Sequence, residues 1–114
     1  MDNRNDIMKK VRANRFASNN GTVMNALNIL RIKYEKLSEI QPALDIPEDQ
    51  FLDSINFLEL AGYILIRDYR TRKPTSIADT DMAYLEAKIS EKGIRLFDDT
   101  NKAGGKSPDE KIDL

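Results

Sequence analysis

The chain has 114 residues, of which 40% are hydrophobic and 32% charged, with a net charge of −1 and neither cysteine nor histidine. This length supports one domain with a single core, and no apolar run approaches the roughly 18 residues of a membrane span. The missing residue types exclude thiol nucleophiles, imidazole bases and the usual zinc sites. We therefore expect a cytoplasmic, non-enzymatic protein with no cofactor, no metal and no membrane contact.

Residues 1–20 are expected to form a basic arm or a short helix. Ile7, Met8, Val11 and Phe16 suggest one apolar side of a helix, and the polar run at 18–21, which ends in glycine, predicts an interruption. Residues 1–15 hold five cations against Asp2 and Asp6. The cations of this arm are Arg4, Lys9, Lys10, Arg12 and Arg15.

Residues 21–99 are expected to form the folded domain, which begins with helices. Val23, Leu27, Leu30 and Tyr34 follow helical spacing and predict a helix over 22–37. A short, turn-rich helix is expected over 38–44, broken at Pro42.

A further helix is predicted over 47–61. Asp45 is a candidate cap, Pro47 is tolerated in a first turn, and the acids that follow favour the positive end of a helix dipole. We expect Phe51, Ile55 and Leu58 to face the core. The opposite face then holds Asp49, Asp53, Asn56, Phe57 and Leu60, with no lysine or arginine.

Two strands and a closing helix are expected after Gly62, a residue type that commonly ends helices. Residues 63–67 predict one strand, residues 68–80 a long polar loop, and residues 82–89 an alternating second strand, which together make a hairpin. In the following ISEKG stretch, Ser90 is expected to cap a helix, and Gly93 to let its first turn approach the sheet. That helix is expected to end near Asp98, before a flexible tail over 100–114.

This order of elements predicts an α+β winged helix: three N-terminal helices, a β-hairpin wing and a closing helix. The stretches EDQFLDSINFLELAGYI and AKISEKGIRLF, within residues 25–97, resemble the YjcQ-like proteins of bacterial and prophage genomes. That resemblance implies a winged-helix fold in a family without an established biochemical role. The basic first 20 residues and the longer wing at 67–82 depart from the family pattern.

Two hypotheses about function stay open. By analogy with the fold, the chain is a DNA-binding transcriptional regulator of phage or mobile-element origin. Because the helix over 47–61 has four acids and no base, contacts with duplex DNA are expected from the wing and the arm. The wing candidates are Arg67, Arg70, Arg72 and Lys73, and the arm candidates are Lys9, Lys10, Arg12 and Arg15.

The alternative hypothesis is a protein-interaction or homodimerisation module that does not bind DNA. It uses the acidic and apolar face formed by Asp49, Asp53, Asn56, Phe57 and Leu60. In a third arrangement, the chain's own basic and apolar N-terminal segment packs across that face and buries it.

Overall fold

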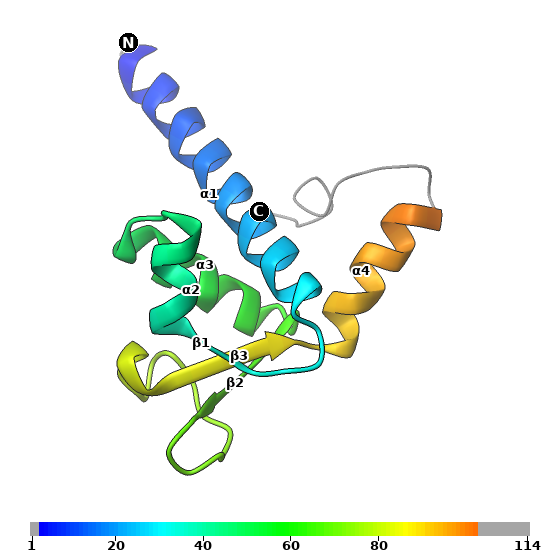
Figure 1. The fold of residues 1–114 in the computed structure, drawn as a ribbon. Coiled ribbons are helices and arrows are strands. Elements are labelled where there is room, and N and C mark those ends of the chain that lie inside the picture. The colour runs from blue at the N-terminus through cyan, green and yellow to red at the C-terminus, as the bar shows by residue number, and fades with distance from the viewer. Residues whose placement is uncertain (1–2, 103–114) are drawn as a thin grey trace.

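The computed structural model describes residues 3–102, which form four α-helices and a three-stranded antiparallel sheet (Figure 1). The predicted α+β class is therefore confirmed. In chain order the elements are α1 (Asn3–Ile29), β1 (Glu35–Lys36), α2 (Leu37–Leu44), α3 (Glu48–Leu60), β2 (Ile64–Asp68), the 3₁₀ turn η1 (Met82–Tyr84), β3 (Leu85–Ile89) and α4 (Glu91–Lys102). The strands lie in the order β1-β3-β2.

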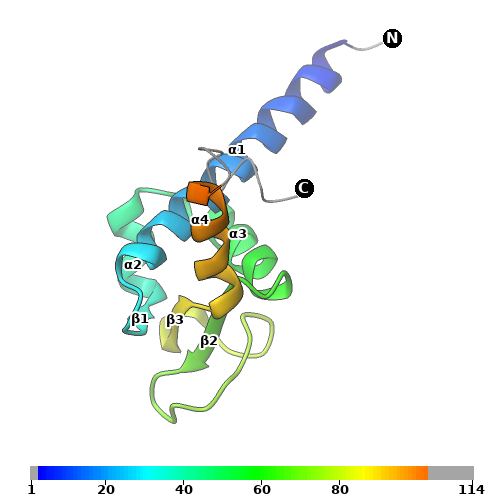
Figure 2. The ribbon, with the colours of Figure 1, turned by 90° about the vertical axis from the view of Figure 1, so that its right-hand side faces the viewer.

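The core lies between one face of the sheet and the helices α1, α2 and α3 (Figures 1 and 2). β3 is central, and it pairs with β2 from Ile64↔Ile89 to Asp68↔Leu85. Alternation along β3 sends its apolar side chains inward, as predicted. The largest fully buried side chains of the core are Phe51, Met24, Leu27, Leu37, Ile55, Leu58, Leu85, Ile89 and Val23.

The predicted interruption of the first helix is wrong, because α1 runs without a break through residues 18–21. Asn20 and Gly21 are buried in the middle of this helix, and Val23 and Leu27 in the next turns are buried as well. Packing against the core therefore outweighs the low helix propensity of this polar run. Although α1 has 27 residues, no helix within 3–102 combines the length and apolar character needed to cross a membrane.

The predicted extension of the helix to residue 37 is also wrong. α1 ends at Ile29, a turn follows in which the Lys33 amide donates to the Leu30 carbonyl, and Glu35 then pairs with Ala87 of the sheet. Pairing with β3 gives this segment backbone partners that a continued helix would not reach. The early helix end leaves Ile29 and Ile32 strongly exposed, at 82% and 87%.

The boundary between α2 and α3 differs from the prediction in two details. Pro42 does not break α2, which continues to Leu44. Asp45 does not cap α3, because it adopts a left-handed conformation (φ 55°) that closes α2, with its amide donating to the Pro42 carbonyl. Pro47 occupies the position before α3, whose predicted extent is otherwise confirmed.

The sequence predicts that the second strand begins at residue 82, but residues 82–84 form the 3₁₀ turn η1 instead. The Asp81 carboxylate accepts a hydrogen bond from the Ala83 amide at 2.8 Å, which stabilises that turn and delays the start of β3 to Leu85. At the other end of the chain, α4 continues to Lys102, past the predicted end near Asp98. The rest of the predicted tail, residues 103–114, lies outside the described residues.

The junction between β3 and α4 is built as the ISEKG stretch predicts. Ser90 Oγ accepts a hydrogen bond from the Gly93 amide at 3.1 Å and donates one to the Gly62 carbonyl at 2.5 Å. A Cβ atom on Gly93 would overlap the Tyr63 carbonyl oxygen and lie 2.6 Å from Ile89 Cγ1. Gly62 adopts φ +83°, the left-handed conformation expected after α3. These hydrogen bonds and the close packing of Gly93 therefore hold the first turn of α4 against the corner where α3 meets the sheet.

Candidate functional site

The outward face of α3 is acidic, as predicted. Asp49, Asp53 and Asn56 are exposed, and Leu60 is 78% exposed. Phe57, the fifth residue of the predicted interaction face, is half-buried instead. Because α3 contains no lysine or arginine, the helix that would enter the DNA groove in a winged helix carries only negative charge here.

The N-terminal helix covers part of that face through one aromatic contact. The ring of Phe16 meets the ring of Phe57 edge-on, with centroids 5.5 Å apart at 73°. Asn19 Nδ2 also donates a hydrogen bond to Gln50 Oε1 at 3.2 Å. The predicted packing of the whole apolar arm across α3 is wrong, because Ile7, Met8 and Val11 keep 59%, 43% and 41% of their surface exposed.

A crevice of about 370 Å³ lies between α1 and α3 beside this contact. Arg12 and Arg15 stand on its α1 side, and Asp49 and Asp53 stand on its α3 side. None of these four forms an ion pair with another residue of the range 3–102. Opposite charges therefore face each other here without direct contact.

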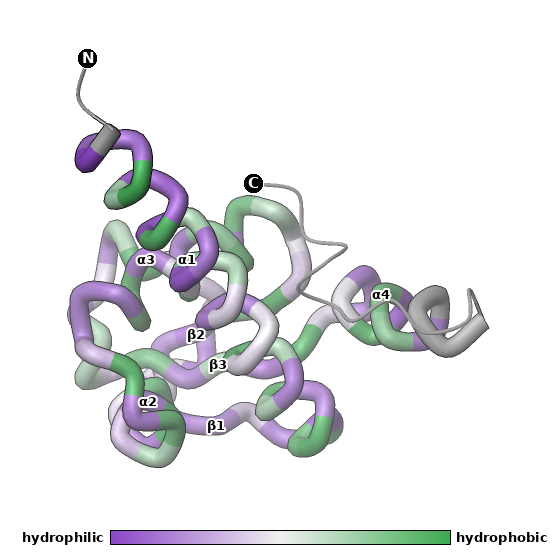
Figure 3. The backbone as a smooth tube through the Cα atoms, turned by 90° about the horizontal axis from the view of Figure 1, so that it is seen from above, coloured by the Kyte–Doolittle hydropathy of each residue, from purple (hydrophilic) through white to green (hydrophobic). Residues whose placement is uncertain are grey.

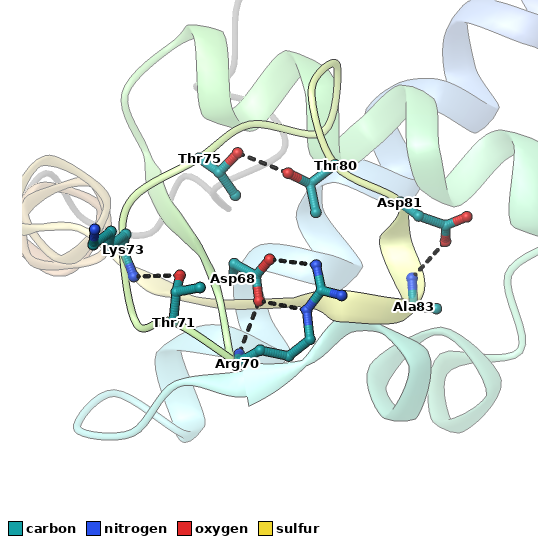
Figure 4. A network of polar contacts seen from close by, with 8 residues as sticks. All are labelled: Asp68, Arg70, Thr71, Lys73, Thr75, Thr80, Asp81 and Ala83. Atoms are coloured by element: carbon teal, nitrogen blue, oxygen red, sulfur yellow. Dashed lines mark hydrogen bonds and ion pairs between the residues drawn. The ribbon is translucent and has the colours of Figure 1, made fainter.

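The wing begins with a charged pair that fixes its own turn (Figure 4). Arg70 donates to both carboxylate oxygens of Asp68, at 3.1 and 2.8 Å, and the Arg70 amide donates to the same carboxylate at 2.8 Å. The side-chain hydrogen bonds from Arg70 lower the pKa of Asp68 to about 2, and Asp68 in turn raises the pKa of Arg70. The Arg70 guanidinium also lies 3.7 Å from the centre of the Tyr84 ring.

The chain then folds back along the outer edge of β2. The Asp68 amide donates to the Lys73 carbonyl at 3.0 Å, and the Thr75 amide donates to the Ile66 carbonyl at 3.2 Å. Arg72 holds the left-handed conformation (φ 60°) that makes this turn possible. Both Arg72 and Lys73 are exposed, and neither side chain has an ion pair within the described part of the chain.

The outer face of the sheet carries a cluster of cations and tyrosines that the sequence prediction included only in part. Arg67 forms an ion pair with Glu86 at 2.5 Å and lies 3.7 Å from the centre of the Tyr34 ring. Lys88 lies 5.5 Å from the same ring, and Lys36 lies 4.5 Å from the Tyr69 ring. The alternation along β3 could have predicted part of this cluster, because it places Glu86 and Lys88 on the sheet face opposite the buried residues.

The structure separates the two basic segments that the sequence grouped together. The basic N-terminal half of α1 projects from one end of the molecule, whereas the wing loop lies at the opposite end (Figures 1 and 2). Lys9, Lys10, Arg12 and Arg15 are all exposed on α1, far along the molecule from Arg72 and Lys73. The arm and the wing are therefore two surfaces, not one continuous interface.

Comparisons with known proteins give no assignment for these surfaces. No protein-family model, curated protein or solved structure matches the chain. Within residues 3–102, no three aspartate or glutamate side chains gather as metal ligands would. The candidate sites described above therefore consist of charged and aromatic surface groups.

Proposed function

We propose that the chain is a winged-helix protein that binds duplex DNA through phosphate contacts from its wing and the outer face of its sheet. The element order supports this proposal: helix, strand, two helices and a hairpin, followed by a closing helix, with the first strand beside the last. A regulatory role and kinship with the YjcQ-like proteins are part of the same proposal and rest on the fold and on the stretches quoted above.

The acidic face of α3 is the reason for placing the contact elsewhere. Duplex DNA carries about one negative charge per 1.7 Å of helix axis, so a helix with exposed Asp49 and Asp53 is repelled by it. Asn56 has a side chain that can pair with adenine, but base contacts need basic neighbours to hold the protein in register. α3 supplies none.

The proposal rests on two cations at the wing turn that form no ion pair within the described residues. Arg72 and Lys73 are exposed there without an ion pair in the described residues, on a turn held rigid by Asp68. Arg67 and Arg70 are engaged by carboxylates, so their charges contribute less to phosphate binding. Lys36 and Lys88 extend the basic surface across the sheet.

Titration of a fluorescent duplex at low salt tests this proposal. Arg72→Ala/Lys73→Ala should weaken binding at least tenfold, because each lost phosphate contact removes favourable counterion release. Lys9→Ala/Lys10→Ala is the matched control, since it removes the same two charges from the other end of the molecule. Equal weakening by both variants, or no binding by the parent chain, would refute a wing-centred site.

A further inference from the structure

The N-terminal half of α1 carries an apolar strip that nothing in the described structure covers. Ile7, Met8 and Val11 share one face of the helix and are 59%, 43% and 41% exposed. Lys10, three positions after Ile7, is a helical neighbour of this strip, and Arg15, four positions after Val11, lies between the strip and the crevice that α1 forms with α3. Green and purple segments alternate along this half of α1 in Figure 3.

The strip points away from the molecule's own core. Leu27, which is buried, follows Val11 by 16 positions, and at about 100° per residue the two side chains lie roughly 160° apart around α1. Since α1 is one uninterrupted helix, the strip cannot turn toward α3 of the same chain without breaking it. Within residues 3–102, the chain therefore has no surface of its own that can bury the strip.

The complementary surface is present on the same chain. α3 presents exposed Asp49 and Asp53 on the same face as Leu60, which lies about two or three turns further along the helix and is 78% exposed. Neither aspartate has an ion pair within residues 3–102. The strip is basic and apolar, and this face of α3 is acidic and apolar, so the two surfaces match in charge and in hydrophobic character.

We propose that two copies of the chain form a dimer by exchanging their α1 arms, with the strip of each copy seated on the α3 face of the other. A two-fold arrangement of this kind makes the same contact twice, which is the usual geometry of a homodimer. The proposal does not depend on DNA binding and stands or falls separately.

Light scattering on the full chain across a range of concentrations measures the association. The parent protein should show twice the chain mass of 13.0 kDa at high concentration and dissociate on dilution. Val11→Ser and Leu60→Ser should each raise the dimer dissociation constant about tenfold or more, because each removes buried apolar surface from the contact. Ile32→Ser is the matched control: its side chain is 87% exposed but lies outside both surfaces, so the association should not change.

A charge exchange tests the pairing of the two surfaces directly. Lys10→Glu gives a chain with an acid beside the strip and leaves Arg15 unchanged, because Arg15 faces the α3 acids of its own chain across the crevice. Asp49→Lys/Asp53→Lys gives a chain with a basic α3 face. Each variant alone should be monomeric. Mixed together they should form a heterodimer, because the acid beside the strip of one then meets the basic face of the other.

Four outcomes would overturn the proposal. The first is a parent chain that stays monomeric at high concentration. The second is a dimer that Ile32→Ser disrupts and Val11→Ser does not, which would place the contact at the loop after α1. The third is a monomer that sediments with vesicles of anionic phospholipid, because the strip would then belong to a membrane surface. Failure of the mixed variants to associate would likewise reject the exchange of arms.

Discussion

Replacing Gly93 with alanine tests the close approach of α4 to the sheet. The new Cβ atom would overlap the Tyr63 carbonyl oxygen, lie 2.6 Å from Ile89 Cγ1 and lie 3.1 Å from Met24 Cε. Overpacking of this kind costs about 2–3 kcal/mol, because a backbone carbonyl cannot rotate out of the way. Alanine returns about 0.5–1 kcal/mol of helix propensity, so the net loss in the free energy of unfolding should be about 1–2.5 kcal/mol.

Urea denaturation followed by circular dichroism measures this loss, and the melting temperature should fall by about 5–15 °C. Arg95→Ala is the control for helix propensity, because it changes an exposed residue of the same helix and removes only its ion pair with Glu91. That control should shift stability by less than about 0.5 kcal/mol. A Gly93→Ala protein as stable as its parent would refute the close packing of α4 on this corner.

Two further predictions concern the capping serine and the wing. Ser90→Ala should cost about 1–2 kcal/mol in urea denaturation, because Gly93 loses its hydrogen-bond acceptor and Gly62 its donor; an unchanged midpoint would exclude the cap. The pKa of Asp68 is lowered by Arg70 from 3.8 to about 2, so its stabilising contribution is present above pH 3.8 and is lost as the pH falls toward 2. Tyrosine fluorescence should follow that loss, and Asp68→Asn should abolish this part of the pH profile; a profile identical to the parent's would contradict the prediction.

The features predicted well from the sequence are those set by local chemistry. The inward face of α3 follows from the helical spacing of Phe51, Ile55 and Leu58, all of which are fully buried. The turn into α4 follows from a capping serine and a glycine at the right distance, and both play the predicted roles. Such signals need only the neighbouring residues, so the sequence contains them in full.

The features that were missed depend on contacts between distant segments. The continuity of α1 through residues 18–21 comes from the packing of Val23, Met24 and Leu27 in the following turns against the core, which local propensity does not express. The pairing of Arg67 with Glu86 depends on strand register, since the two residues are 19 positions apart. The sequence therefore predicts the basic wing, but it does not show that Arg67 and Arg70 form ion pairs with carboxylates.

The salt dependence of duplex binding decides whether the wing binds DNA through phosphate contacts. Plots of log affinity against log salt concentration should be steep for the parent chain, and the slope for Arg72→Ala/Lys73→Ala should be shallower by about 2, one for each lost phosphate contact. The slope for Lys9→Ala/Lys10→Ala should stay at the parent value. A flat parent plot, or a loss of slope in the arm variant alone, would contradict DNA binding through the wing.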